Sequence, residues 1–313
     1  MCCEKPAYGK KREEAKDEKM DLWERLKQAG YREEMLAELS RAEEKLERFP
    51  AWKELCACVP AAVGENEERE MEELAREADV PLHTLLFLHI LQNLGALART
   101  YREQGIPEAR FSDFVADDIR RKVEECLAFE GSIGVFRAAY DFYKGYFDLR
   151  KLTIGRLRYE KGVYRGPDVR CGAYALREGD TVQRIHIPGG YPLKKEACLQ
   201  SLRTAFEQFG CSASRPLRCS CHSWLLNPAH RQMLTRPSNL LDFMDLFIMI
   251  SAQEQDSFKD AFRLFGPASR DDMSRWPAET RLQRAYLDLL RSGGKAATGF
   301  GVLFFDGNRV NPR

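Results

Sequence analysis

The chain has 313 residues, of which 44% are hydrophobic and 31% charged. This balance excludes an intrinsically disordered, collagenous or fibrous protein. Its 49 Lys and Arg residues offset 48 Asp and Glu residues, giving a formal net charge of +1. The chain therefore lacks the overall basic field that is typical of nucleic-acid-binding proteins. The length favours two domains.

The charge is unevenly distributed between the two halves. Residues 1–150 contain 24 basic and 32 acidic side chains, a net charge of −8, whereas residues 151–313 carry a net charge of +9. The basic half can attract an anionic ligand such as a phosphate, a nucleotide or coenzyme A. Two domains that dock on each other would show the same asymmetry, and the sequence leaves both interpretations open.

Targeting signals and cysteine spacing both favour a cytoplasmic protein. Residues 1–19 are charged and have no apolar core, which predicts a flexible lead-in rather than a secretory signal. The longest apolar stretch, residues 85–98, is too short to cross a bilayer. The ten cysteines form no Cys-x-x-Cys pair, so neither a metal site nor a disulfide framework is expected. We expect no metal, no membrane partner and no nucleic-acid partner.

The region 20–150 is predicted to be a helical bundle. Apolar residues recur with helical spacing over 35–49 and over 111–126. A third stretch, following Pro81 and ending near Gly105, is apolar nearly all round and is expected to be the central helix. Two further helices are expected, with Asn66 and Ser132 as their N-caps. No strand-like alternation occurs before about residue 150.

The region 151–313 is predicted to be a mixed β-sheet flanked by helices. Alternating and β-branched stretches predict strands at 152–159, 173–176, 181–187, 218–224, 247–251 and 300–305. Helical spacing and capping residues predict helices at 194–209, from Ser238 onward, and at 280–292. The predicted fold is therefore α+β with two domains, a helical one over 20–150 and a sheet domain over 151–313.

Five short segments of the second half carry a family resemblance in combination. They are GRLRYE (155–160), HIPGGYPL (186–193), CHSWLLNP (221–228), SNLLDF (238–243) and ETRLQRA (279–285). Together they resemble a bacterial family of acyltransferases, in which a helical N-terminal domain precedes a domain like that of the GNAT acyltransferases. The resemblance covers residues 150–313 in its motifs and the first half in helical character only. It implies acyl transfer from acetyl-CoA or another acyl-CoA to an amine or similar small-molecule acceptor.

The resemblance also implies where the donor binds. In GNAT-like domains acyl-CoA lies in an opening between two central strands, and its pyrophosphate binds backbone N–H groups where the helix after the first strand begins. Here that strand is 181–187, the loop is 188–193, and the helix begins near Lys194. The loop departs from the usual Gln/Arg-x-x-Gly-x-Gly/Ala pattern, although its two glycines permit close approach and positive φ. The implied donor-binding residues are Ile187, Gly189, Gly190, Lys194 and Lys195.

Two of the five histidines are candidates for proton transfer. His186 ends the first central strand and His222 lies in the second, so the mapping brings both to the opening. Imidazole can act as base or acid near neutral pH. The tyrosine that many family members use as an acid has no counterpart after the second strand, because no Tyr occurs between Tyr191 and Tyr286. His89, on the apolar helix, is expected to be a hydrogen-bonded core residue.

The sequence leaves alternatives open. Strand alternation places His222 on one face and Cys219 and Cys221 on the other, without showing which face meets the opening. A thiol nucleophile, Cys221 with His186 on a neighbouring strand, is one alternative chemistry. Another is a catalytically silent module that binds acyl-CoA, a nucleotide or a protein partner. The acceptor, the acyl group and the oligomeric state are not specified by these residues.

Overall fold

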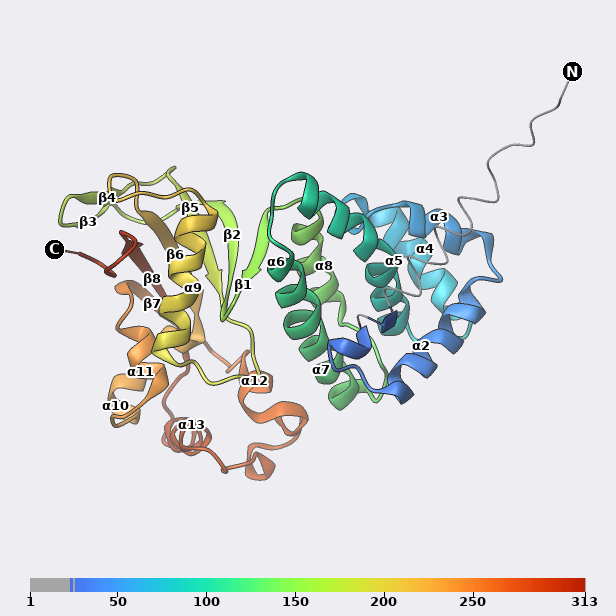
Figure 1. Cartoon of the computed structure of the whole chain (residues 1–313). Coiled ribbons are helices and arrows are strands. Elements are labelled where there is room, and N and C mark those ends of the chain that lie inside the picture. The colour runs from blue at the N-terminus through green and yellow to red at the C-terminus, as the bar shows by residue number, and fades with distance from the viewer. Residues whose placement is uncertain (1–22, 25, 313) are drawn as a thin grey trace, which may run out of the picture. The chain divides into compact units, whose positions relative to one another are not determined.

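The computed structural model describes residues 23–24 and 26–312, and the chain divides into two compact units, Met1–Leu149 and Arg150–Arg313 (Figure 1). The predicted lead-in over residues 1–19 lies outside the described residues. The described part of the first unit contains helices and no strand, whereas the second combines helices with parallel and antiparallel strands. The predicted α+β class is therefore confirmed.

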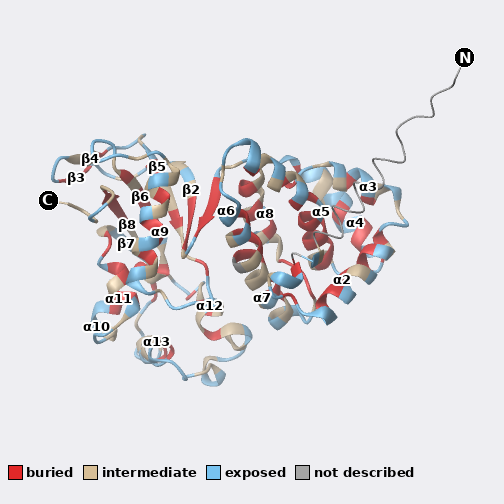
Figure 2. Ribbon diagram, in the orientation of Figure 1, coloured by how far each residue is buried: buried red, intermediate tan, exposed pale blue. Residues whose placement is uncertain are grey.

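The first unit is organised around its longest helix. From residue 33 onward its α-helices are α2 (Glu33–Leu46), α3 (Pro50–Ala57), α4 (Glu65–Glu77), α5 (Leu82–Glu103), α6 (Glu108–Ser112), α7 (Arg120–Glu130) and α8 (Arg137–Phe147). Every residue from 85 to 91 of α5 is buried (Figure 2), and α5 contacts α2, α3, α4, α6 and α8. This confirms the predicted central helix, because a helix that is apolar all round must be covered on all sides.

Two N-caps predicted from the sequence of the first unit are wrong. Asn66 is not the N-cap of α4 but lies within its first turn, where it accepts a hydrogen bond from Arg69. The cap position is Gly64, whose N–H donates to the Glu67 carboxylate at 2.9 Å. Ser132 likewise does not cap α8, since the residue at that N-cap is Phe136. Hydroxyl and amide side chains near a helix start favour a cap without fixing which residue takes it.

The apolar stripe predicted over 111–126 runs through three joined segments. Between α6 and α7 lies a π-helical segment, Asp113–Ile119. Its buried Asp118 accepts hydrogen bonds from the hydroxyls of Tyr143 and Tyr146, at 3.2 and 2.9 Å. The carboxylate is thus satisfied inside the bundle, as a buried charged group must be.

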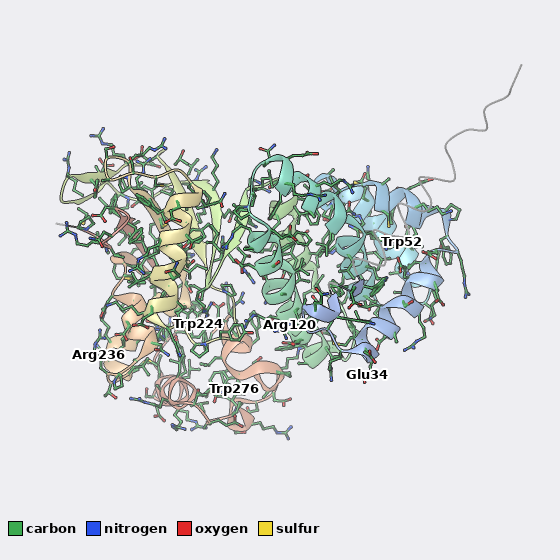
Figure 3. All side chains as sticks on the ribbon, in the orientation of Figure 1. Glu34, Trp52, Arg120, Trp224, Arg236 and Trp276 are labelled. Carbon is green, nitrogen blue, oxygen red and sulfur yellow. The ribbon has the colours of Figure 1, made fainter. Side chains whose placement is uncertain are left out.

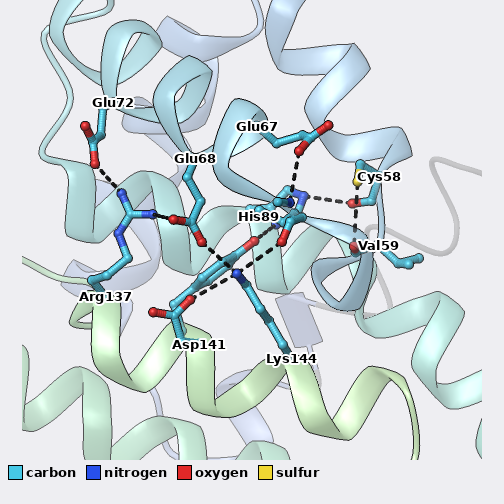
Figure 4. Close-up of polar contacts among 12 residues, drawn as sticks. Cys58, Val59, Glu67, Glu68, Glu72, His89, Arg137, Asp141 and Lys144 are labelled. Carbon is cyan, nitrogen blue, oxygen red and sulfur yellow. Dashed lines mark hydrogen bonds and ion pairs between the residues drawn. The ribbon is translucent and has the colours of Figure 1, made fainter.

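His89 is a satisfied core residue, as the sequence predicts. Its Nε2 lies 2.9 Å from the carbonyl oxygens of Leu55 and Cys58, and its Nδ1 lies 2.8 Å from the hydroxyl of Tyr140 (Figure 4). The carbonyls require the proton on Nε2, so the tyrosine donates to Nδ1. Burial lowers the pKa of His89, which keeps the imidazole neutral. Nearby, Lys144 pairs with Glu68 at 2.7 Å.

The second unit contains one large sheet, one small sheet and several helices. The strands are β1 (Lys151–Ile154), β2 (Leu157–Val163), β3 (Val169–Cys171), β4 (Tyr174–Leu176), β5 (Thr181–His186), β6 (Leu217–Ser223), β7 (Ile248–Glu254) and β8 (Ala297–Phe305). The α-helices are α9 (Lys195–Gln208), α10 (His230–Met233), α11 (Asn239–Met244), α12 (Ala261–Phe265) and α13 (Arg281–Arg291). Ser238 caps α11, as predicted, by accepting from the N–H of Leu241.

The large sheet has the order β1-β2-β5-β6-β8-β7. All neighbouring pairs are antiparallel except β5 and β6, which are parallel and joined by the crossover helix α9. β3 and β4 form a separate two-stranded sheet. The two central strands predicted from the sequence are therefore neighbours in one sheet.

The two faces of the large sheet are covered differently. On one face α9 buries Leu202 and Ala205, and its Ser201 hydroxyl lies 3.0 Å from the hydroxyl of Tyr159 on β2. On the other face, the β3–β4 hairpin packs on an apolar cluster that includes Val182 of β5 and Phe304 of β8. Alternation along each strand therefore assigns every side chain to the α9 face or to the hairpin face.

Two strand predictions are wrong in detail. The stretch predicted as one strand over 152–159 is a β-hairpin, in which β1 and β2 are joined at Gly155 and Arg156. Gly155 has φ of +57°, which lets the chain reverse in two residues. β3 (Val169–Cys171) was not predicted.

We expect Gly299→Ala to destabilise the second unit. A Cβ at Gly299 would lie 2.1 Å from the carbonyl oxygen of Leu226, and a backbone atom cannot move aside as a side chain end can. The overpacking predicts a loss of about 1–3 kcal/mol in the free energy of unfolding. Urea unfolding measures it, with Gly189→Ala as the control, since a Cβ there meets nothing within 4 Å. Equal stability of the two variants would contradict the close approach.

Candidate functional site

The central feature of the second unit is the short parallel pairing between β5 and β6. Only two register pairs join these strands, Gln183 with Cys219 and Arg184 with Ser220. Beyond them β5 continues to His186 and β6 continues to Ser223. The two strands therefore share no register pair at their carboxyl ends.

Beyond their last shared register pair, β5 and β6 each remain paired with the neighbouring strand on the other side. β5 remains paired with β2 up to Arg158 opposite His186. β6 remains paired with β8 up to Ser223 opposite Gly299. The sheet is thus continuous on both sides of the place where the resemblance implies an opening, with β2–β5 on one side and β6–β8 on the other.

His186 stands on the β5 side of the opening and is paired with a carboxylate. Its Nε2 lies 2.7 Å from an oxygen of Glu160 on β2, whose side chain is 13% exposed. Glu160 is the register partner of Arg184, so the pair forms diagonally across two adjacent strands on one face. Lys151 of β1 lies 3.9 Å from the other carboxylate oxygen. The histidine is therefore oriented by a nearly buried acid.

The surroundings of His186 set its protonation. Burial is the largest influence and lowers its pKa below the ordinary value, with Lys151 and Arg158 acting in the same direction. Glu160 opposes them and raises the pKa through its hydrogen bond and charge. Because a carboxylate only accepts hydrogen bonds, Nε2 carries the proton and the neutral ring has its lone pair on Nδ1. Such a ring can act as a general base at neutral pH.

His222 stands on the β6 side and is exposed. Its ring packs edge-on against Phe300 of β8, with centroids 6.2 Å apart, which assigns it to the hairpin face. His186 lies on that same face, because it follows Val182 and Arg184 in the alternation of β5. Both histidines therefore lie on one face of the sheet, and each lies two residues beyond the last shared register pair.

The cysteines of β6 lie on the opposite face. Cys219 and Cys221 are buried on the α9 side, and burial raises the pKa of the Cys221 thiol to about 12. A thiol that is neutral and enclosed is not a nucleophile. The geometry therefore does not bring together the Cys221–His186 pair that the sequence allowed.

The loop after β5 carries the residues predicted to bind the donor. Ile187 is half-buried, whereas Gly189, Gly190, Lys194 and Lys195 are exposed. Gly190 has φ of +90°, while Gly189 does not have a positive φ, so only one of the two glycines needs that freedom. Helix α9 begins directly after Lys194, and no side chain caps it. Its first N–H groups and its dipole favour an anion here.

The nearest tyrosine after β6 is part of the core. Tyr286 of α13 is fully buried and lies 2.8 Å, through its hydroxyl, from Nε2 of His230. Both residues belong with Trp224, labelled in Figure 3, to an aromatic cluster behind the end of β6. Burial lowers the pKa of His230 to about 4. These two residues hold the segment after β6 in place rather than meeting solvent.

Sequence reasoning missed two residues of this region, Glu160 and Arg156. Both lie in the segment GRLRYE that carries the family resemblance, and Arg156 donates hydrogen bonds to the carbonyls of the loop after β5. Their roles depend on which strands pair and in which register, and neither is visible as a local pattern. The segment's presence among the family motifs was the one signal that pointed to them.

Among residues 23–24 and 26–312, no group of three or more His, Cys, Asp or Glu side chains is arranged to hold a metal ion. In the same part of the chain no single helix combines the length and apolar composition that a bilayer crossing requires; α4 and α5 reach them only together, across a bend of 119°.

The chain matches two family models. Residues 20–139 match an N-acyltransferase N-terminal domain, and residues 152–303 match a GNAT-like C-terminal domain. No curated protein sequence matches the chain.

Solved structures with this fold are acyltransferases. An acyltransferase in complex with decanoyl-CoA is 19% identical, with a TM-score of 0.59 over 90% of this chain and 98% of that one. An acyltransferase in complex with decanoyl-CoA and teicoplanin is 18% identical, with a TM-score of 0.58 over 71% of this chain and 67% of that one. A mutant acyltransferase with octanoyl-CoA is 17% identical, with a TM-score of 0.58 over 86% and 88%. These likenesses concern the fold.

We expect Glu160→Gln to lower the pKa of His186 further. The substitution removes the charge and hydrogen bond that raise this pKa, and it leaves the burial that lowers it. The neutral imidazole then persists to lower pH. Titration of the imidazole resonances by NMR measures the change, with the exposed Glu178→Gln as the control. A pKa that stays constant or rises would contradict the coupling between the two residues.

Proposed function

We propose that this chain, which belongs to the acyltransferases with an N-acyltransferase N-terminal domain and a GNAT-like C-terminal domain, transfers an acyl group from acyl-CoA to an amine or similar small-molecule acceptor. The observation that carries the proposal is the split between β5 and β6, followed directly by an uncapped helix. An extended thioester can enter between the strands while its phosphates meet the start of α9. The acyl-CoA complexes of proteins with this fold support the same donor.

The proposed donor site uses the residues at the junction of β5 and α9. Backbone groups of Ile187, Gly189 and Gly190 line the approach, and Lys194 and Lys195 add two positive charges. The phosphates of CoA are anionic, so the exposed lysines and the helix dipole both favour them. Teicoplanin, seen in one of the similar acyltransferases, is a small-molecule ligand of that protein, and we propose a small-molecule acceptor here as well.

The proposed chemistry is attack of an amine on the thioester carbonyl. The nitrogen forms a bond to the carbonyl carbon, loses a proton, and the bond to sulfur breaks to release CoA thiol. We assign the general base to His186, because Glu160 fixes its tautomer and burial keeps it neutral. His222 lies across the split on the same face and is the candidate for returning a proton to the departing sulfur.

A silent acyl-CoA-binding module is the competing function. Two observations favour it: the loop after β5 departs from the usual family pattern, and Tyr286, the first tyrosine after β6, is fully buried. Calorimetric titration with CoA separates a scaffold from a ligand-binding protein. Release of free thiol from acyl-CoA across a panel of amines then separates an enzyme from a silent binder.

A cytoplasmic location is part of the proposal. The eight cysteines within the described residues are all free thiols, which suits a reducing compartment.

We expect His186→Ala to lower the rate of acyl transfer by about 10²-fold or more, the usual contribution of a positioned general base. CoA affinity is expected to be retained, because the imidazole acts on the acceptor rather than on the phosphates. Initial rates of thiol release and calorimetry measure the two effects, with the thermal midpoint as the check on folding. His222→Ala is the matched comparison, as an exposed histidine on the facing strand. A folded His186→Ala variant within about threefold of wild type would exclude His186 as the base.

We expect Gly189→Val to weaken CoA binding without unfolding the second unit. A Cβ at Gly189 meets nothing within 4 Å, so the branched side chain is accommodated by the free protein but obstructs a phosphate that approaches the loop. Loss of a charged hydrogen bond predicts a weakening of about 1–3 kcal/mol. Calorimetry on Gly189→Val and Gly189→Ala measures it. Unchanged affinity in the folded valine variant would refute this placement of the pyrophosphate.

A further inference from the structure

The loop after β5 is rich in glycine and proline. Over residues 188–192 it contains two glycines and two prolines, and residues 189–192 are exposed. A Gly-rich segment has high conformational entropy, and ordering it costs free energy. Anion binding by backbone N–H groups requires those groups to point one way before the ligand arrives. A contact that orders this loop before the ligand arrives therefore favours anion binding by it.

Arg156 makes the contacts that order it. The guanidinium donates from Nη1 to the carbonyl of Pro188 at 2.9 Å and from Nη2 to the carbonyl of Tyr191 at 2.8 Å. Its Nε lies 3.4 Å from the carbonyl of Pro192. One planar, rigid fork of N–H donors thus binds both ends of the loop, which a lysine ammonium cannot reproduce.

These contacts also fix the direction of the loop's N–H groups. In a trans peptide the C=O and the following N–H point to opposite sides of the chain. The carbonyls of Pro188 and Pro192 point at the guanidinium, so the N–H groups of Gly189 and Leu193 are directed away from it. The carbonyl oxygens, which are the negative ends of these peptide dipoles, therefore face Arg156. The N–H groups, which are the positive ends, point to the opposite side.

Arg156 stands on a rigid support. It lies in the two-residue turn between β1 and β2, which are paired along four residue pairs, from Lys151 with Glu160 to Ile154 with Leu157. The same hairpin carries Glu160, the partner of His186. One hairpin therefore carries both Arg156, which contacts the loop, and Glu160, which orients His186.

We propose that Arg156 is a positioning residue for the acyl-CoA donor: it grips the carbonyls of the loop 188–192 so that the loop presents its N–H groups to the donor's pyrophosphate. This inference rests on the proposed function. Arg156 acts through the loop, by its hydrogen bonds to the loop carbonyls.

The test compares Arg156→Lys with Arg203→Lys, a control on the exposed face of α9. Binding of octanoyl-CoA and of octanoyl-pantetheine, which lacks the pyrophosphate, is measured by calorimetry on the full chain. Lysine keeps the positive charge but cannot contact both ends of the loop at once. We therefore expect Arg156→Lys to lower the affinity for octanoyl-CoA about tenfold, the equivalent of one charged hydrogen bond. The affinity of Arg156→Lys for octanoyl-pantetheine is expected to stay within about threefold of wild type, because this ligand has no pyrophosphate for the loop to bind.

The outcomes separate this inference from the proposed function. If wild type binds octanoyl-CoA and Arg156→Lys binds it equally well, the inference is wrong and the proposed function stands. If Arg156→Lys weakens both ligands by the same factor, Arg156 stabilises the fold without positioning the pyrophosphate, and the inference is again wrong. If wild type does not bind octanoyl-CoA or CoA, both the proposed function and the inference fail.

Discussion

The organisation of the second unit depends on a parallel strand pairing that stops after two residues. Parallel ladders normally run the length of the shorter strand, but β5 and β6 share only the pairs at Gln183 and Arg184. Their carboxyl ends remain hydrogen-bonded to their outer neighbours, β2 and β8. The close approach of Leu226 to Gly299 anchors the β8 side. The backbone at the ends of both strands therefore remains hydrogen-bonded although β5 and β6 no longer pair there.

The β1–β2 hairpin serves both sides of the chemistry proposed here. Its turn contributes Arg156 to the loop, and β2 contributes Glu160 to His186. On the other face, the Tyr159 hydroxyl of β2 meets Ser201, whose own hydroxyl donates to the carbonyl of Ile154. The hairpin is therefore fixed to α9 through Tyr159 and Ile154, which lie within two residues of Glu160 and Arg156 in the sequence. A site held by two paired strands is more precise than one held by loops alone.

Local patterns predicted the elements that frame the site, and long-range register supplied the rest. The strands ending near His186 and containing His222, the helix after Lys194 and the Ser238 cap all followed from alternation, helical spacing and capping. Glu160 could not be found this way, because its contact with His186 exists only when β2 pairs with β5 in one particular register. The hairpin itself was predicted as one strand because the apolar alternation was followed through Gly155-Arg156, although a Gly at the first of two turn positions is a usual hairpin signal. The two N-caps predicted in the first half failed because the N-cap positions of these helices are Gly64 and Phe136, where no side chain provides the cap.

The two faces of the split sheet show how the same physical cause gives different chemical capacities. Burial disfavours charge, so it raises the pKa of Cys221 on the α9 face and lowers the pKa of His186 on the hairpin face. Both groups are therefore neutral near pH 7. The nucleophilic form of cysteine is the thiolate, so a neutral thiol is a poor nucleophile. A neutral imidazole, in contrast, has the lone pair that accepts a proton. Desolvation of the sheet thus favours proton transfer by histidine over thiol chemistry, and Glu160 decides which nitrogen of the ring carries out that transfer.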